Sequence, residues 1–374
     1  MHDARLLIDT LRLGAPADAG ALASAWTRAD ASALVREAAF EGASLWLHRR
    51  LKALGITLTG EAGETLAANA KRAIAFSLRL ESETVATIGI LDAAGVGAVP
   101  LKGAAMRRIA ARIPFADARA PNDVDILVRD EHAQRAWNAL VAKGYAPIKD
   151  SGPSEGHHLP ALAGPLGISV EIHLTTSPRV SPAEAWRRAT IDGAVAEFAG
   201  AVWRVPSDTE LFWHAAAHAV THTEEYGRVG ARLRYWLDAA ALLAANAPID
   251  WARIRARLDS RECREPARVC AWIRTASDLS GQPLAASALG ERTGPAFDVE
   301  RMVSWRLHVF AHNAPDARWT ERLIEEGARG EARLPHEPAF RDARSVARIR
   351  HAVAARAARL WWTLRRSAGS ASRV

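Results

Sequence analysis

The chain has 374 residues, of which 49% are hydrophobic, enough to bury a sizeable core and to form two or three packed units. This length excludes a small disulfide-stapled module, and the two cysteines, Cys263 and Cys270, lack a second pair for a metal site, so they indicate structural thiols in a reducing compartment. The net charge of +7 is uneven, because residues 341–374 hold nine arginines and one aspartate while the rest of the chain is nearly neutral.

The beginning of the sequence does not resemble a secretory signal, because Asp3 comes early and no uninterrupted apolar stretch follows. A run of about 18 apolar residues, which a membrane-spanning helix needs, is also absent from the sequence. We therefore expect a soluble, cytoplasmic protein without a transmembrane segment.

Residues 1–94 are expected to be helical. Asp30 can cap one helix that runs to Leu51 and stops at Gly55. A second helix is predicted from Glu61 to Ala94, because its apolar residues recur at helical spacing until Gly95.

The next segment predicts a strand, a glycine turn and a helix. The apolar run 97–101 stops at Lys102 and Gly103, and residues 104–110 have helix-forming composition. Such a turn places backbone N–H groups at a helix N-terminus, where phosphate binds readily. Lys102 is one of only five lysines in the chain, and the competing interpretation is an ordinary surface lysine.

Two carboxylates mark the strand predicted over residues 122–128. Asp123 and Asp125 share one face, because side chains alternate along a strand, while apolar side chains between and after them form the buried face. At about 4 Å, two such charges repel by roughly 4 kcal/mol at an effective dielectric near 20. A magnesium ion would reverse this cost, and it commonly binds one or two carboxylates together with phosphates. The competing interpretation is a pair at the solvated end of a strand.

A helix that Asp130 can cap, ending at Gly144, leads to a second strand over residues 168–174. Its apolar residues share one face, and Ser169, Glu171 and His173 share the other. Glu171 can supply a third carboxylate, and three acids on two adjacent strands form the usual frame for two-metal phosphoryl or nucleotidyl transfer. A solvated strand face is the alternative.

Helical pattern returns after Pro206, opened by the capping box that begins at Ser207. His214, His218 and His222 follow at four-residue spacing and share a face, which suggests zinc. The His-Glu-x-x-His order is missing and aromatic residues precede the first histidine, so we favour hydrogen-bonded core histidines over zinc.

The remaining C-terminal part offers two features. Arg232, Arg234 and Asp238 can close a nucleotide cleft or form a structural ion pair. The basic tail, residues 341–374, can contact RNA or anionic lipid, or it can be a helix packed by its apolar side chains.

Several of these segments occur in the order of a known family. The chain resembles the uncharacterised nucleotidyltransferase family, a branch of the DNA polymerase beta-like superfamily, at Leu101-Lys102-Gly103, Arg119, Asp123–Val128, Gly144-Tyr145, Val170–His173, His214, His218, Arg232, Leu233 and Asp238. The resemblance implies an α+β fold with a small mixed sheet flanked by helical regions. The expected units are a helical region 1–94, a nucleotidyltransferase-like core 95–205, and a helical region 206–374 that ends in the basic tail.

The resemblance also implies an activity, the Mg-dependent transfer of a nucleoside monophosphate from an NTP, with ATP as the first choice. Two Mg ions are possible, with Mn as a substitute. The acceptor is open: small molecule, peptide, protein or RNA. The implied site residues are the metal ligands Asp123, Asp125 and Glu171, which together with His173 are catalytic, and the nucleotide-binding residues Lys102, Gly103, Arg119 and Arg232.

One departure keeps a second function open. The superfamily usually carries Gly-Ser or Gly-Gly at the turn where this chain has Lys102 and Gly103. The alternative is therefore a catalytically inactive nucleotide-binding or interaction protein with the same fold.

Overall fold

The computed structural model describes residues 3–307, except 17, 119–121, 149–156, 178, 199–200, 231–232, 286, 293, 295, 297–298, 301–302 and 305–306. Side chains of residues 196–202 and 221–230 are also outside the description. Arg119, Arg232, the side chain of His222 and the basic tail 341–374 therefore lie outside the described residues.

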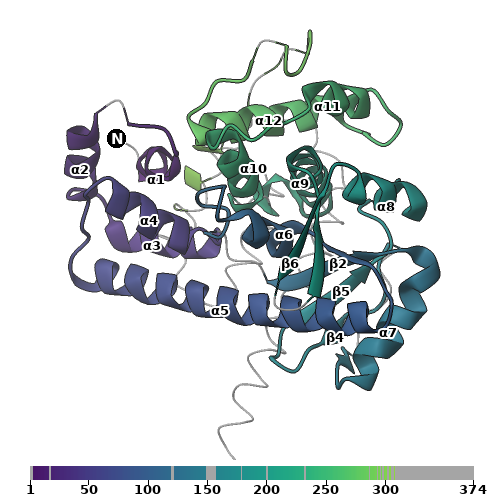
Figure 1. Cartoon of the computed structure of the whole chain (residues 1–374). Helices are drawn as coiled ribbons and strands as arrows, with labels where there is room; N and C mark the ends of the chain where they lie inside the picture. Colours follow the sequence, from purple (N-terminus) through teal and green to yellow (C-terminus); the bar gives the residue numbers. More distant parts are fainter. Residues whose placement is uncertain are drawn as a thin grey trace, which may run out of the picture.

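The α+β architecture is confirmed (Figure 1). A five-stranded mixed sheet has the order β1-β2-β5-β4-β3, in which β2 and β5 are parallel and the other neighbours are antiparallel. Its strands are β1 (Ala98–Pro100), β2 (Asp123–Val128), β3 (Ala146–Pro147), β4 (Leu162–Ala163) and β5 (Ser169–His173).

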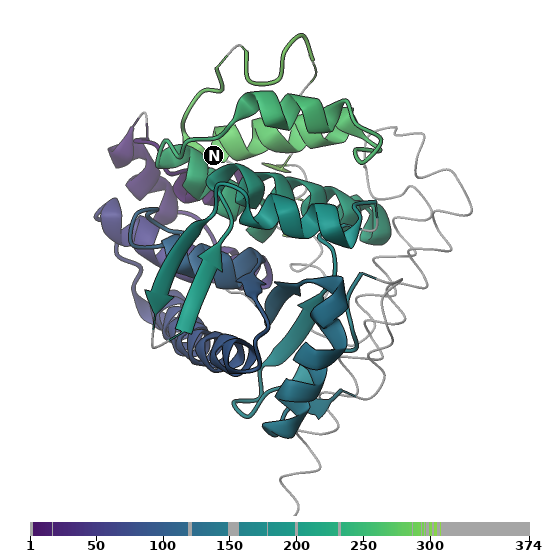
Figure 2. The same ribbon diagram turned by 45° about the vertical axis from the view of Figure 1, so that its right-hand side comes forward.

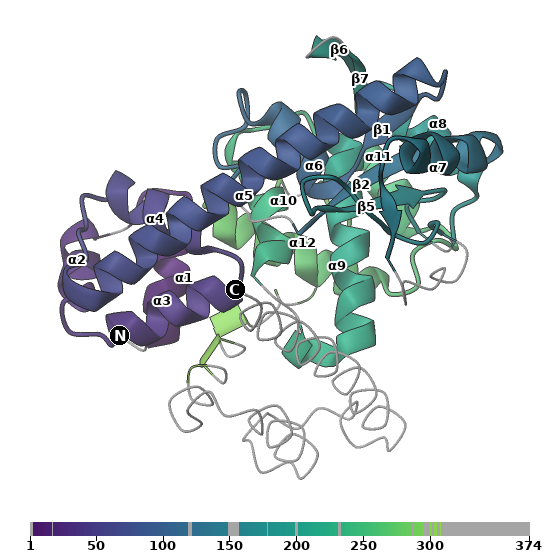
Figure 3. The same cartoon turned by 90° about the horizontal axis from the view of Figure 1, so that it is seen from below.

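Five helices precede the sheet: α1 (Asp3–Leu11), α2 (Ala19–Trp26), α3 (Ala31–Phe40), α4 (Ser44–Ala53) and α5 (Gly60–Ala93). Asp30 caps α3 as expected, since its Oδ1 accepts from the backbone N–H of Ala33 at 2.9 Å. The prediction of a single helix from Asp30 to Leu51 is wrong, because Gly42 adopts φ +70° and turns the chain between α3 and α4. The long helix α5 is confirmed, and it runs from the N-terminal helices to the sheet (Figure 3).

One face of the sheet is apolar and lies on α5 and α7 (Ala133–Ala142). Its central side chains are fully buried: Val124, Ile126, Val128, Val170 and Ile172. The sequence predicted that Asp130 caps α7, and this prediction is wrong. Residues Asp130–His132 form a separate 3-10 turn before the helix begins.

The opposite face of β2 and β5 carries the polar residues. It lies near α6 (Lys102–Ile109), which contacts both β2 and α9 (Asp208–Gly230). A hairpin of β6 (Ala194–Phe198) and β7 (Ala201–Val205) forms a second sheet that the sequence did not predict. Figure 2 shows this hairpin beside the main sheet, and β7 contacts both α5 and β1.

The remaining helices are α8 (Pro182–Thr190), α10 (Arg234–Ala244), α11 (Trp251–Leu258) and α12 (Pro266–Ser280). The cap expected at Ser207 is confirmed, because its hydroxyl accepts from the N–H of Glu210 at 3.3 Å. Cys263 and Cys270 are both free thiols, and Cys270 is buried. Among the described residues, no helix is long and apolar enough to cross a membrane.

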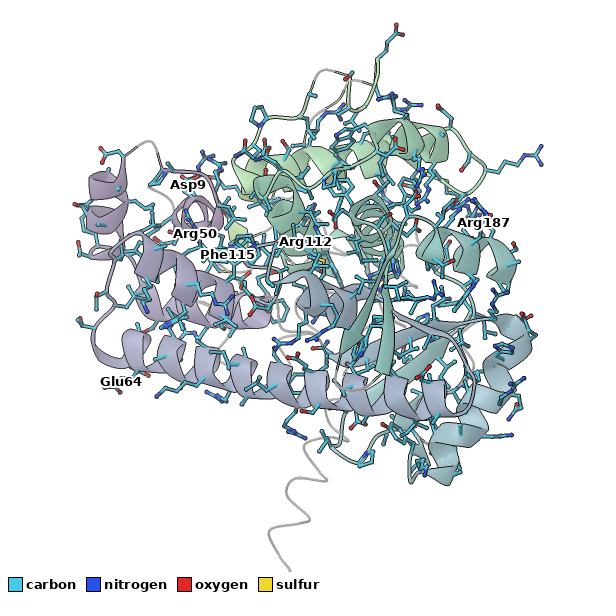
Figure 4. The ribbon with its side chains drawn as sticks, viewed as in Figure 1. Asp9, Arg50, Glu64, Arg112, Phe115 and Arg187 are labelled. Carbon is cyan, nitrogen blue, oxygen red and sulfur yellow. The ribbon has the colours of Figure 1, made fainter. Side chains whose placement is uncertain are left out.

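The N-terminal and C-terminal helices share one hydrophobic core, which also includes α6. Figure 4 labels Arg50, Arg112 and Phe115 in the region where these helices meet. Phe115 packs on Trp46 with ring centroids 5.0 Å apart, and Arg112 pairs with Asp208 at the start of α9. The first contact joins the segment after α6 to α4, and the second joins it to the start of α9. Helix α6 itself contacts both α9 and β2.

Candidate active site on the polar face of the sheet

The parallel pairing of β2 with β5 lines up the polar residues of the two strands. Asp123 pairs with Ser169, Asp125 pairs with Glu171, and Leu127 pairs with His173. Because parallel neighbours at the same register point to the same side, these polar side chains share a face, as the alternation in the sequence predicted.

Asp125 is the centre of this face, and it is 1% exposed. Its Oδ1 accepts hydrogen bonds from Nζ of Lys102 and from Nε2 of His173, each at 2.8 Å. Burial alone would raise the pKa of Asp125, but the charges and hydrogen bonds of Lys102 and His173 hold it well below its usual range. The carboxylate is therefore ionised and already balanced by positive charge.

Lys102 is not an ordinary surface lysine, because its side chain is only 18% exposed and is bonded to Asp125. Burial opposes its charge, yet the nearby charges of Asp125, Asp123 and Glu171 outweigh burial and raise the pKa of Lys102. The repulsion expected between Asp123 and Asp125 is thus reduced by an ammonium group supplied from the turn.

The backbone of Lys102 is also unusual, with φ +46° at the first residue of α6. A left-handed conformation costs a residue other than glycine about 1–2 kcal/mol, and such cost often marks a functional site. Gly103 follows as the second residue of α6, and the N–H of Leu101 donates to the carbonyl of Asp125 at 2.9 Å.

Glu171 and His173 form the other half of the site. Nε2 of His173 lies 3.4 Å from Oε2 of Glu171. Burial lowers the pKa of His173, but its hydrogen bonds to the two carboxylates outweigh burial and raise it. Burial would raise the pKa of Glu171, and the hydrogen bond from His173 brings it below the usual value instead. The alternative of a solvated strand face does not hold for His173, which is 4% exposed, whereas Glu171 is partly exposed.

Three more histidines reach this face, and the sequence did not assign them to it. His158 forms a backbone bridge with His173, and its Nε2 lies 3.9 Å from Oε2 of Glu171. The ring of His157 lies 5.1 Å from that of His158, and burial lowers the pKa of His157 to about 4. The adjacent pair His157-His158 was the available signal in the sequence.

His214 comes from α9 and is buried near the same charges. Burial, together with the positive charges of Lys102 and His173, lowers the pKa of His214 to about 3. Its ring lies 6.1 Å from that of His218.

The side chains that can hold a metal ion are grouped closely. One ligand atom each from Asp125, Glu171 and His173 lies within 4.8 Å of the others. Asp123 lies on the same face at the beginning of β2 and is partly exposed. This donor set, with the buried carboxylate of Asp125, the partly buried carboxylate of Glu171 and a lysine turn beside them, fits a divalent cation and a phosphate ligand.

The chain matches the model of a known family. The model of a family described as uncharacterised nucleotidyltransferase matches residues 27–276, more than half of the sequence. No curated protein and no solved structure matches it. The matched range includes every element that builds the polar face of the sheet.

Proposed function

Because the chain belongs to the uncharacterised nucleotidyltransferase family, we propose that it transfers a nucleoside monophosphate from an NTP to an acceptor and releases pyrophosphate. The observation that carries this proposal is the buried Asp125, which is bonded to Lys102 of the turn and stands opposite Glu171 on the parallel strand. ATP is the first candidate donor. The proposed acceptor classes are a small molecule, a peptide, a protein and an RNA, and the proposed compartment is the cytoplasm.

Asp123, Asp125 and Glu171 would hold magnesium, and two ions are possible. When bound, the metal would offset the negative charge of the phosphates and of the forming oxyanion. The protein contributes a buried face on which the carboxylates are fixed by strand pairing and by hydrogen bonds to Lys102 and His173.

Lys102 and the N-terminus of α6 would bind the triphosphate. An ammonium group and backbone N–H groups at the start of a helix both favour phosphate binding. Because Gly103 has no side chain, the triphosphate can approach the backbone closely. Arg119 and Arg232, which lie outside the described residues, are proposed as further phosphate ligands on the family resemblance.

In the transfer itself, the oxygen of an acceptor hydroxyl forms a bond to the α-phosphorus. The bond from this phosphorus to the bridging oxygen breaks, and pyrophosphate leaves with the electron pair. The proton of the hydroxyl passes to Glu171 or His173, whose side chains lie 3.4 Å apart in the site.

The test is incubation of the full chain with each labelled NTP, magnesium and pools of acceptors, followed by mass analysis of protein and small molecules. We expect pyrophosphate and a product heavier by one nucleoside monophosphate, both absent in Asp125→Asn. If no acceptor is modified and no pyrophosphate forms, while nucleotides still raise the melting temperature, the chain is the inactive nucleotide-binding protein instead.

A further inference from the structure

His173 lies where a metal ligand would lie. Its Nε2 is 2.8 Å from Oδ1 of Asp125 and 3.4 Å from Oε2 of Glu171. Two ligands bound at about 2.0–2.2 Å to one ion are roughly 2.8–3.6 Å apart, for ligand angles between a right angle and the tetrahedral angle. The nitrogen is therefore spaced from each oxygen like two atoms that bind one cation, and one ligand atom from each of the three residues lies within 4.8 Å of the others.

The surroundings of the carboxylates are rich in imidazole. His158 also approaches Glu171, with 3.9 Å between its Nε2 and Oε2 of Glu171. The rings of His157 and His158 lie 6.3 Å and 5.3 Å from that of His173. Magnesium prefers oxygen ligands and retains water, whereas imidazole suits transition metals. A site designed only for magnesium would not need these donors.

We propose, on the basis of the proposed function, that His173 binds the metal directly together with Asp125 and Glu171. The site then takes a first-row transition-metal ion ahead of magnesium. This assignment adds a nitrogen ligand to a set that the sequence predicted to be made of carboxylates only.

Two consequences follow for the neighbouring residues. The metal and Lys102 share Oδ1 of Asp125, so the ammonium group turns toward the phosphates when both metal and nucleotide are present. A nitrogen that binds metal cannot accept a proton, so the proton of the acceptor hydroxyl passes to Glu171 rather than to His173.

The test uses the full chain, freed of metal and loaded with Mn²⁺ alone. Pulsed electron paramagnetic resonance detects a ¹⁴N nucleus bound to Mn²⁺ as a modulation of the spin echo. We expect this modulation in the wild type, its loss in His173→Gln, and its retention in His158→Gln and in His48→Gln, which removes a histidine of α4. Growth with ¹⁵N-histidine should shift the modulation frequency in the wild type, and this control does not depend on how a variant folds.

Isothermal titration supplies a second measurement. We expect Mn²⁺ and Zn²⁺ to bind the wild type at least tenfold more tightly than Mg²⁺, and His173→Gln to reduce their affinity tenfold or more. The same variant should change Mg²⁺ affinity less than twofold.

The outcomes separate this inference from the proposed function. Mn²⁺ that binds without ¹⁴N modulation, or with unchanged affinity in His173→Gln, overturns the assignment of His173 even if nucleotide transfer is found. Nitrogen modulation from His173 without any product from any NTP supports the assignment and contradicts the proposed transfer.

Discussion

At the level of single residues, Asp125 is balanced before any ion binds, because Lys102 and His173 both donate to its Oδ1. Replacing it removes the partner of a buried ammonium, and breaking a buried pair from one side typically costs about 3–5 kcal/mol. We expect Asp125→Asn to lower the free energy of unfolding toward the lower end of this range, since the amide oxygen still accepts one bond. Urea unfolding of the metal-free protein measures it.

Asp123→Asn is the matched control for that experiment. Asp123 is partly exposed, and exposed charges typically contribute only about 0–1 kcal/mol. Equal losses in the two variants would mean that the Lys102 pair does not stabilise the fold. The sequence alone leads to the opposite expectation, in which removing either charge relieves repulsion, because it does not show where the Lys102 ammonium lies.

Lys102 combines a strained backbone with a buried charge, and two substitutions separate them. Lys102→Met keeps φ +46° and loses the charge, whereas Lys102→Gly loses both the charge and the strain. We expect the glycine variant to be more stable than the methionine variant by about 1 kcal/mol, and both to bind ATP at least tenfold more weakly than the wild type. Thermal unfolding and titration calorimetry measure these effects. Equal stability of the two variants would show that the turn is not strained.

His214 makes the free energy of unfolding depend on pH in a range where ordinary carboxylates do not titrate. Burial and nearby positive charge lower its pKa to about 3, whereas an unfolded histidine titrates near pH 6.5. The folded form thus binds fewer protons below that pH, so stability present above pH 6.5 is lost as the pH falls, by at most about 1.4 kcal/mol per pH unit.

We expect His214→Gln to flatten the loss of stability between about pH 6.5 and 4.5, a window that lies above the usual carboxyl range. His173 does not mask the effect, because its pKa is raised and its contribution is fully present below pH 6.5. His157, with a pKa lowered to about 4, leaves a residual slope. An unchanged profile in denaturant titrations across this window would contradict the burial of a neutral His214.

The residues of the site show how far a sequence can lead. The shared face of Asp123, Asp125, Glu171 and His173 could be predicted, because alternation along a strand is a local property. The approach of His158 and His214 could not, since it depends on strand pairing with β5 and on the packing of α9 against α6. The Lys102 ion pair depends likewise on the pairing of β1 with β2.

At the level of elements, the turn between β4 and β5 is held by a buried carboxylate of α5. Glu83 is 1% exposed, and its Oε2 accepts from the N–H of Leu166 at 3.0 Å. A Cβ added at Gly164 would lie under 3.0 Å from this carboxylate. We expect Gly164→Ala to lower the free energy of unfolding by about 1–3 kcal/mol, as overpacking usually does.

Gly89 is the matched control. It lies on α5, the helix that carries Glu83, and a Cβ added there meets nothing within 4 Å. Since glycine weakens a helix interior, Gly89→Ala should raise the free energy of unfolding by about 0.5–1 kcal/mol. Chemical denaturation of both variants measures the contrast, and a stabilising Gly164→Ala would show that Glu83 does not hold the turn.

The helices and strands also show where the spacing of apolar residues does not predict secondary structure. Helix α5 was predicted with nearly the right ends, because its pattern is long and glycine follows it. The break at Gly42 was missed, since the apolar pattern continues on both sides of it. The β6–β7 hairpin was missed because its residues, many of them alanine, give a weak alternation.

At the level of the whole molecule, the helices before and after the sheet are joined in one core. The backbone N–H of Leu13 donates to the carbonyl of Leu279 at 2.9 Å. Arg50 holds the segment around Leu13 in place by donating to the carbonyls of Thr10 and Gly14 at 3.2 and 3.1 Å. The sequence could not show this, because the contact joins residues almost as far apart as the described chain allows. The division into 1–94, 95–205 and 206–374 stays a proposal about the order of units along the chain.

Two glycines lie against each other where the two ends of the described chain meet. Gly281, which ends α12 at φ +70°, faces Gly14, and a Cβ on Gly281 would lie 2.5 Å from Cα of Gly14. The backbone of Gly14 cannot move away from the added Cβ as easily as a flexible side chain could. Gly281→Ala therefore combines a left-handed backbone cost of about 1–2 kcal/mol with a clash of about 1–3 kcal/mol.

Gly55→Ala separates these two contributions. Gly55 has nearly the same φ, +68°, but nothing lies within 4 Å of its added Cβ, so only the backbone cost remains. We expect Gly281→Ala to lose at least 1 kcal/mol more free energy of unfolding than Gly55→Ala, as measured by urea unfolding. Hydrogen exchange should also show faster opening of α1 in Gly281→Ala than in Gly55→Ala, because α1 and α12 pack on each other. Equal losses and equal exchange would mean that the two ends of the described chain do not stabilise one another through this contact.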